Sequence, residues 1–325
     1  MKSFDIKTKI YFGDNAMDRV REIPYSRILI ITDKFFSGSS MLRIVTQPLS
    51  ETNKEFRIFN DVVPDPPVEK IVNGVKVVLD YKPDCLIAVG GGSVIDSAKA
   101  IREFAVKMET GLNIALIAIP TTSGTGSEVT AFSVITDTAN HMKYPLVSDS
   151  MLPDEAILDE ELVKSVPPNV TADTGMDVLT HAIEAYTSIN NNEFSAALAE
   201  KSVEICGAFL MRAYLDGNGM PAVKCTWRPV WRDWLSIQPL WGLTTAWRIS
   251  WARISIFRTA ARMQCFCRTS SNTTAASTYI RECRNNIPSR WKNTFRSPAF
   301  WDFRTSIRSQ RCARSSTGYN LWIRK

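Results

Sequence analysis

A chain of 325 residues is long enough for two domains, each with its own hydrophobic core. It has no apolar run of the roughly 18 residues that a membrane-spanning helix needs, and residues 1–9 lack the apolar core of a signal peptide. We therefore expect a cytoplasmic protein with no membrane partner. The net charge of +6 is the sum of an acidic part and a basic part. Residues 1–220 carry 20 Lys and Arg against 30 Asp and Glu, whereas residues 221–325 carry 19 Lys and Arg against 3 Asp and Glu.

Apolar patterning over the first part of the chain predicts strands that alternate with helices. Residues 27–33, 55–59, 86–89, 113–119 and 131–136 have the pattern of strands, and residues 71–79 and 94–104 that of helices. This order is typical of an α/β fold with a mostly parallel, Rossmann-like sheet. From residue 167 the pattern changes to helices, at 175–186 and 194–214.

Three domains follow from these patterns and from the change in composition. We expect a dinucleotide-binding α/β domain at 1–165, the start of an all-helical metal and substrate domain at 166–220, and an aberrant basic tail at 221–325 that does not pack well.

The stretch of residues 84–99 is the centre of the predicted α/β domain. Its apolar strand ends abruptly in Gly90, Gly91 and Gly92, and Ser93 follows where a helix N-cap is expected, with Asp96 in a near capping box. A bare turn that opens a helix presents N–H groups at the positive end of the helix dipole, which favours phosphate binding. The alternative is a tight turn that needs glycine for positive φ and binds nothing.

Two further segments follow predicted parallel strands. Asp33 ends the first of these strands, where a carboxylate can accept the hydroxyls of a ribose, although it can equally be an ordinary helix cap. Residues 120–130 follow another strand and are rich in hydroxyls and glycine, as in a ligand-binding loop or a plain polar loop.

Asp177 and His181 are spaced i, i+4 on a predicted helix, so both side chains lie on one face. A carboxylate and an imidazole at this spacing can hold one divalent metal ion or form a hydrogen-bonded pair without a metal. His141 lies in a polar stretch and is expected to be a solvated loop residue.

Taken together, the motifs closely resemble those of the iron-containing (group III) alcohol dehydrogenase family, over roughly residues 5–218. The segments that carry the resemblance are Ile-Thr-Asp33, Val-Val-Pro-Asp-Pro66, Gly-Gly-Gly-Ser-x-x-Asp-x-x-Lys-Ala100, Pro-Thr-Thr-Ser-Gly-Thr-Gly-Ser-Glu128, Lys143-Tyr-Pro and Gly-Met-Asp-x-x-Thr-His-Ala-Ile-Glu184. Within the family, the sequence is most similar to propanol dehydrogenases of propanediol-degrading microcompartments.

The resemblance implies an N-terminal dinucleotide domain, a helical domain, and a hydride transfer between NAD and a small primary alcohol or aldehyde. In that comparison Asp33 meets the adenosine ribose, and Asp177 and His181 are two of four ligands of Fe²⁺, with Zn²⁺ as the alternative metal. A homo-oligomer and association with a bacterial microcompartment are also implied. The implied cofactor-binding set is Asp33, Gly90, Gly91, Gly92, Ser93, Asp96, Thr121, Thr122, Thr125, Thr130 and Lys143.

The tail departs from the family pattern. The resemblance implies that the two remaining metal ligands are histidines. The chain contains only His141 and His181, so residues 221–325 cannot supply these ligands and no catalytic set is intact. A one-base shift of reading frame that begins between about Gly217 and Val223 explains this. Regrouped codons for residues 245–263 are compatible with the family segment HGMAHQLGANFHIPHGRANA, and the shift also explains why all nine Trp lie beyond residue 220.

Three hypotheses follow from the sequence. The first is an NAD-dependent, iron-type alcohol dehydrogenase, and the second is a non-catalytic frameshifted remnant that retains at most the nucleotide site. The third is a zinc-dependent, glycerol-dehydrogenase-like enzyme. A nucleic-acid-binding role for the basic, Trp-rich tail is not favoured, since a shifted frame accounts for its composition.

Overall fold

The computed structural model describes residues 6–215, except residues 14, 139, 141, 165, 189 and 190. Its main element is a six-stranded sheet in the order β1-β8-β5-β4-β2-β3, in which all the pairs are parallel. The prediction of a parallel α/β fold is thereby confirmed. The strands are β1 (Lys9–Phe12), β2 (Arg27–Asp33), β3 (Glu55–Val62), β4 (Cys85–Gly90), β5 (Ala115–Pro120) and β8 (Glu155–Leu158).

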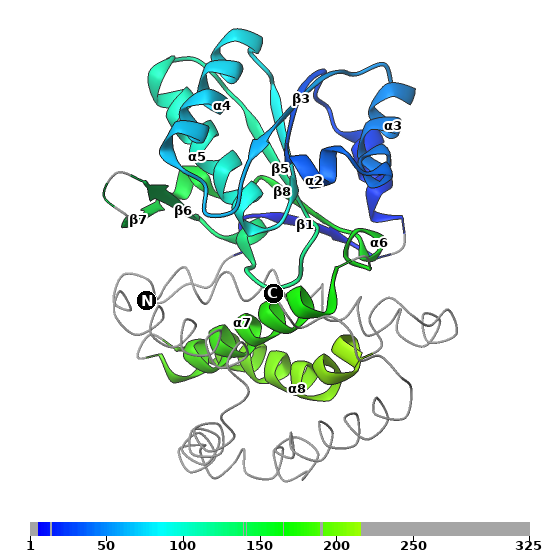
Figure 1. Cartoon of the computed structure of the whole chain (residues 1–325), viewed down its shortest axis with the longest axis vertical. Helices are drawn as coiled ribbons and strands as arrows, with labels where there is room; N and C mark the ends of the chain where they lie inside the picture. The colour runs from blue at the N-terminus through cyan, green and yellow to red at the C-terminus, as the bar shows by residue number, and fades with distance from the viewer. Residues whose placement is uncertain are drawn as a thin grey trace, which may run out of the picture. The chain divides into compact units, whose positions relative to one another are not determined.

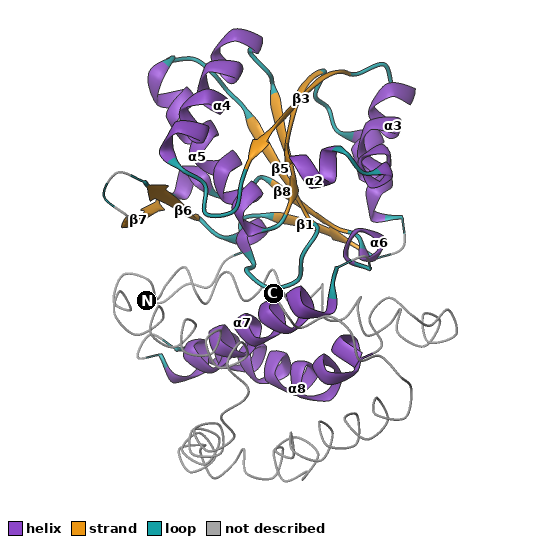
Figure 2. Cartoon of the chain, viewed as in Figure 1, coloured by secondary structure: helices purple, strands orange, loops and turns teal. Residues whose placement is uncertain are grey.

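Helices cover the two faces of this sheet (Figures 1 and 2). One face carries α4 (Val68–Tyr81) and α5 (Gly92–Met108), and the other carries α1 (Arg19–Glu22), α2 (Lys34–Ser37) and α3 (Arg43–Glu51). Because β4 is buried on both faces, it is a continuous apolar run rather than an alternating one. Leu86 and Ala88 belong to the core under α4 and α5, whereas Ile87 and Val89 belong to the opposite core. A short helix, α6 (Glu160–Val163), and four 3₁₀ turns complete this part, at Ala16–Asp18, Ser40–Leu42, Ser127–Val129 and Asp149–Met151.

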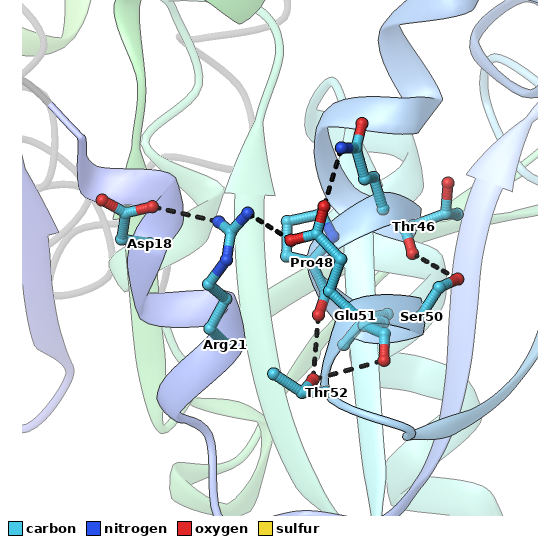
Figure 3. A network of polar contacts seen from close by, with 9 residues as sticks. Asp18, Arg21, Thr46, Pro48, Ser50, Glu51 and Thr52 are labelled. Atoms are coloured by element: carbon cyan, nitrogen blue, oxygen red, sulfur yellow. Dashed lines mark hydrogen bonds and ion pairs between the residues drawn. The ribbon is translucent and has the colours of Figure 1, made fainter.

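The short helices α1 and α3 are joined by polar contacts on the outer face (Figure 3). The guanidinium of Arg21 donates to Asp18 at 3.0 Å and to Glu51 at 2.6 Å, and Gln47 donates to the second oxygen of Glu51. These donors, Gln47 first and then Arg21, hold the pKa of the Glu51 carboxyl below its usual value. The ion pair is exposed, so we expect it to add little to stability beyond fixing the two helices against each other.

The predicted strand at 131–136 is real, but it does not belong to the main sheet. It corresponds to β6 (Phe132–Asp137), which pairs antiparallel with β7 (Met142–Val147) in a separate two-stranded sheet. The two strands are separated by only residues 138–141, and so short a connection permits an antiparallel hairpin but not a parallel crossover. The hairpin is attached to the loop before α4, where Thr136 N–H donates to the carbonyl of Pro66 at 2.9 Å.

Two long helices, α7 (Pro168–Thr187) and α8 (Glu193–Leu215), follow the α/β part and pack against each other. Both correspond to predicted helices, and the pattern changes from α/β to helical between α6 and α7. No helix of the described residues is long and apolar enough to cross a membrane. The tail at 221–325 and its predicted poor packing lie outside the described residues.

Close packing of α4 on α5 supplies a stability prediction. A Cβ added at Gly74 would lie 2.2 Å from Cδ1 of Ile101, a fully buried side chain. Replacing a helical glycine by alanine usually gains up to about 1 kcal/mol, but overpacking a core costs about 1–3 kcal/mol. We therefore expect Gly74→Ala to lower the free energy of unfolding in urea denaturation.

The matched control is Lys76→Ala on the exposed face of the same helix, which we expect to change stability by less than about 0.5 kcal/mol. Adding Ile101→Val, which removes the closest methyl group, should recover part of the Gly74→Ala loss. An unchanged or raised stability in Gly74→Ala would show that the two helices separate without penalty.

Candidate functional site

The glycine turn between β4 and α5 forms as predicted, but its details differ from the sequence analysis. Gly91 is the N-cap and the helix begins at Gly92, so Ser93 lies inside the first turn and does not cap it. The capping box with Asp96 is accordingly wrong. None of the three glycines has positive φ, so the conformational argument for a plain tight turn also fails.

Glycine is required here because other groups approach the backbone closely. A Cβ at Gly90 would lie 2.5 Å from a methyl of Val94, and one at Gly92 would lie 2.8 Å from the hydroxyl of Thr125. At Gly91 the nearest atom would be the hydroxyl oxygen of Thr122, at 3.2 Å. The turn therefore exposes bare backbone at the N-terminus of a 17-residue helix, with hydroxyl groups against it.

The loop of residues 120–130 lies beside this turn. Its beginning is attached to β4, because Thr121 N–H donates to the carbonyl of Gly90 at 3.1 Å. Thr122 and Thr125 lie against Gly91 and Gly92, and the buried hydroxyl of Ser123 has no hydrogen-bond partner among the described residues. The structure thus brings together two segments that the sequence analysis predicted to share one site.

Asp33 lies at the same edge of the sheet. Ile31 on β2 pairs with Ala88 on β4, so Asp33 and Gly90, each two residues further, end the two strands at the same level. The chain leaves β2 for β3 on one side and leaves β4 for β5 on the other, so these strands flank the point where the strand order reverses. Ligands of open α/β sheets bind outside the carboxyl ends of strands at such a point.

Asp33 is also a helix cap. Its Oδ1 accepts the N–H of Phe36 at 2.7 Å at the start of α2. The capping alternative is therefore correct, and it leaves the ribose role open because this bond uses one oxygen of the carboxylate.

A buried polar network fixes the far end of the 120–130 loop. The ammonium of Lys99 on α5 is fully buried and donates to Ser127 Oγ at 2.9 Å, Thr130 Oγ1 at 3.0 Å and the carbonyl of Phe132 at 2.8 Å. Asp96, one turn earlier on the same helix, accepts from the Ser127 hydroxyl at 2.5 Å and from Val134 N–H at 3.0 Å.

Two members of the predicted cofactor set, Asp96 and Thr130, belong to this network. Their polar atoms are bonded to protein groups, and the side chain of Thr130 is buried whereas Asp96 is half-buried. Lys99 and Glu128 both lie within the family-like motifs, but no role was predicted for them from the sequence. The available signal was the Asp-x-x-Lys spacing on an otherwise apolar helix face, where a charge needs a buried partner.

Burial shifts the pKa values of this cluster. Desolvation raises the pKa of Glu128 to about 7, against an opposing hydrogen bond to its own backbone and the attraction of Lys99. Desolvation also lowers the pKa of Lys99 to about 8, opposed by the carboxylates of Asp96 and Glu128. Asp96 likewise has a raised pKa because it is buried. With Glu128 protonated, the three groups together carry no net charge, which is the state that a buried cluster favours.

Lys143 is further along the chain, on the hairpin strand β7. Its ammonium forms an ion pair at 2.5 Å with Asp65, a residue with φ of 51° in the loop before α4. The structure therefore assigns Lys143 a protein partner in the loop before α4 rather than at the glycine turn.

Asp177 and His181 lie on one face of α7, as predicted, with 3.7 Å between Asp177 Oδ1 and His181 Nε2. This separation exceeds a hydrogen bond and suits two ligands of one ion. Nδ1 of His181 is buried without a hydrogen-bond partner in the described part of the chain. No group of three or more potential metal ligands occurs among the described residues, so they fit only half of a four-ligand site. His141 lies outside the described residues.

Comparisons with known proteins identify the family of the chain. A profile of the family described as iron-containing alcohol dehydrogenase matches residues 7–160, and the profile of that family's C-terminal part matches residues 171–224. The 1-propanol dehydrogenase PduQ of Citrobacter freundii is 44% identical over 222 residues, which are 67% of this chain and 58% of that protein. The chain thus spans less than two thirds of this curated relative.

Solved structures give the same result. The iron-containing alcohol dehydrogenase of Thermococcus thioreducens is 30% identical with a TM-score of 0.67, over 75% of this chain and 67% of that one. The sulfoacetaldehyde reductase of Bifidobacterium kashiwanohense, solved in complex with NAD⁺, is 27% identical with a TM-score of 0.66, over 75% of this chain and 66% of that one.

The raised pKa of Glu128 predicts a pH dependence of stability. Its pKa of about 7 in the folded chain lies above its ordinary value of 4.5, so between these values the folded chain holds a proton that the unfolded chain has released. Stability should therefore fall as pH rises through this window. Glu128→Gln removes this titration. We expect the difference in free energy of unfolding between Glu128→Gln and the unmutated chain to shift in favour of the variant by on the order of 1–3 kcal/mol when the pH is raised from 5 to 7.5.

Thermal and urea unfolding at pH 5, 6 and 7.5 measure this difference. Glu200→Gln, at an exposed position on α8, serves as the control and should leave the pH slope unchanged. Parallel pH curves for Glu128→Gln and the unmutated chain would show that Glu128 is ionised in the folded state throughout.

Proposed function

Because the chain belongs to the iron-containing alcohol dehydrogenase family, we propose that its α/β part binds NAD for hydride transfer between the nicotinamide and a small primary alcohol or aldehyde. The observation that carries the proposal is the glycine turn at the N-terminus of α5. There, bare backbone, the hydroxyls of Thr122 and Thr125, and the carboxylate of Asp33 surround the switch point of the sheet. A Cβ at any of the three glycines would occupy the space beside the turn. This supports a ligand that contacts the backbone itself.

Each part of the edge has a role in this proposal. Free N–H groups at Gly91, Gly92 and Ser93 bind the pyrophosphate, helped by the positive end of the α5 dipole. Thr121, Thr122 and Thr125 offer hydroxyls along the channel from the pyrophosphate to the ribose. Lys143 completes the far end of the channel, and Asp96 and Thr130 act indirectly, by holding the loop. The nicotinamide supplies the hydride chemistry when it is bound.

The carboxylate of Asp33 determines the choice between NAD and NADP in this proposal. Its remaining oxygen accepts hydrogen bonds from the adenosine ribose, and its negative charge repels a 2′-phosphate. The proposal of NAD is supported by the relative solved in complex with NAD⁺.

A metal ion held at a complete site would polarise the alcohol oxygen and lower its pKa. Asp177 and His181 fit two ligands of that ion, but the 325 residues contain no other histidine except His141. The residues present therefore fit only part of a metal site. We propose that the codons after about residue 217 are read out of frame. In support, the profile of the family's C-terminal part stops at residue 224, close to the change in composition.

Substrate and location form the finer part of the proposal. The similarity to a 1-propanol dehydrogenase supports a short primary alcohol or its aldehyde as substrate. We also propose a cytoplasmic homo-oligomer, associated with a bacterial microcompartment. Sedimentation of the purified protein and fractionation of the source cells test these two points.

Cofactor preference tests the role of Asp33. We expect NAD⁺ to bind at least about 10-fold more tightly than NADP⁺ to the unmutated chain, as measured by calorimetric titration. Asp33→Gly should narrow the ratio, and so should Asp33→Asn, which removes the charge but keeps an oxygen that can cap α2. Equal affinities for the two nucleotides in the unmutated chain would remove Asp33 from this role.

Metal content tests the reading-frame proposal. We expect the 325-residue chain to lose added Fe²⁺ or Zn²⁺ on desalting, because two protein ligands hold an ion weakly. A gene restored by a one-base change between the codons of residues 217 and 223 should yield a protein that retains about one ion per chain and oxidises 1-propanol with NAD⁺. Stoichiometric metal and activity in the 325-residue chain would contradict the proposal.

A further inference from the structure

We propose that Lys99 is a positioning residue of the dinucleotide site, whose ammonium group holds the loop of residues 120–130 against the glycine turn. This inference rests on the proposed function. It adds Lys99 to the dinucleotide site as a residue that supports the site without contacting the ligand. It is carried by the three hydrogen bonds of the buried ammonium group and by the contacts of the loop with the turn.

Helix α5 joins the two parts of the site. It begins at Gly92, and Lys99 follows seven residues later, or about two helical turns. The helix therefore carries both the glycine turn and the group that grips the loop, so that any tilt of the helix moves both together.

The loop is attached to this strand–helix unit at both ends. Its beginning is bonded to β4 through Thr121 N–H and the carbonyl of Gly90, and its end is bonded to α5 through Ser127 and Thr130. Between these attachments, Thr122 and Thr125 lie against Gly91 and Gly92. Loss of the Lys99 bonds leaves the end of the loop attached to α5 by the Ser127 hydroxyl on Asp96, and the hydroxyls facing the turn are then held less firmly.

The number of donors makes the arrangement dependent on the charge of Lys99. An ammonium group has three N–H donors, and here all three have an acceptor: two hydroxyl oxygens and one backbone carbonyl. A neutral amine has two donors, so deprotonation breaks one of the three bonds and leaves a buried acceptor without a partner. Asp96 and Arg102 on α5 and Glu128 in the loop are the charged groups that act on this ammonium, the carboxylates favouring it and Arg102 opposing it.

The decisive experiment compares NAD⁺ binding by Lys99→Met and by the unmutated full-length chain, by calorimetric titration between pH 6.5 and 9.5. Methionine keeps the length and burial of the side chain but removes all three donors. We expect its affinity for NAD⁺ to be about 10-fold weaker at pH 7. In the unmutated chain, affinity should fall as pH rises through about 8, where Lys99 loses its proton, and in Lys99→Met this fall should be absent.

Two further variants provide controls. Lys107→Met removes a lysine from the same helix, one whose side chain is 66% exposed, and should leave both the affinity and its pH dependence unchanged. Glu128→Gln removes a carboxylate that supports the charge of Lys99, so the fall in affinity should move to lower pH. This second variant keeps Lys99 and therefore tests the proposal even if Lys99→Met does not fold.

Amide hydrogen exchange provides a measurement that needs no nucleotide. In Lys99→Met, exchange should become faster at residues 121–130, whereas residues 85–90 in the buried strand should keep their protection.

The outcomes separate this inference from the proposed function. If the unmutated chain binds no NAD⁺, the proposed function fails and the role of Lys99 fails with it. If the unmutated chain binds NAD⁺, and Lys99→Met binds within about twofold of it with the same pH dependence, the dinucleotide site stands and the role of Lys99 is overturned.

Discussion

A lysine ammonium group buried without solvent is stable only if every one of its donors finds an acceptor, and Lys99 satisfies this condition with atoms from one short segment of chain. The requirement orders that segment, because Ser127, Thr130 and Phe132 must all stay within bonding distance. The ordered segment in turn places Thr122 and Thr125 against the glycine turn. The buried charge of Lys99 thereby helps to fix the position of the loop beside the glycine turn.

Desolvation in the same cluster brings the pKa values of Glu128 and Lys99 close to neutral pH, and the attraction between their charges opposes both shifts. Asp96 accepts two hydrogen bonds, so it is the better of the two carboxylates at staying ionised and balancing the ammonium. Glu128 has one buried oxygen without a hydrogen-bond partner among the described residues, and its proton is retained to higher pH. The cluster is thus most stable with Glu128 protonated and Asp96 ionised. Such a division is typical of buried sites with unequal numbers of acids and bases.

The two halves of the proposed enzyme differ in completeness. The nucleotide half has its turn, its loop and its switch-point carboxylate in one place, on a rigid parallel sheet. The metal half has two ligands on one helix, and the sequence supplies no further histidine for it beyond residue 181. Under the proposed function, dinucleotide binding depends only on the first half, whereas activation of an alcohol depends on both.

The sequence by itself determined five strands, β2 to β6, the position of the glycine turn, the two long helices and the family, since these depend on local apolar periodicity and on motifs of consecutive residues. Strands β1, β7 and β8 were not predicted from it. It also placed Asp177 and His181 on one helix face, because i, i+4 spacing alone decides that. Only the tertiary structure decided that β6 forms a hairpin, that Gly91 rather than Ser93 caps α5, and that Asp96 and Thr130 bond to protein groups. These outcomes depend on contacts such as that of Lys99 with Ser127, 28 residues away, and on burial, which no local pattern encodes.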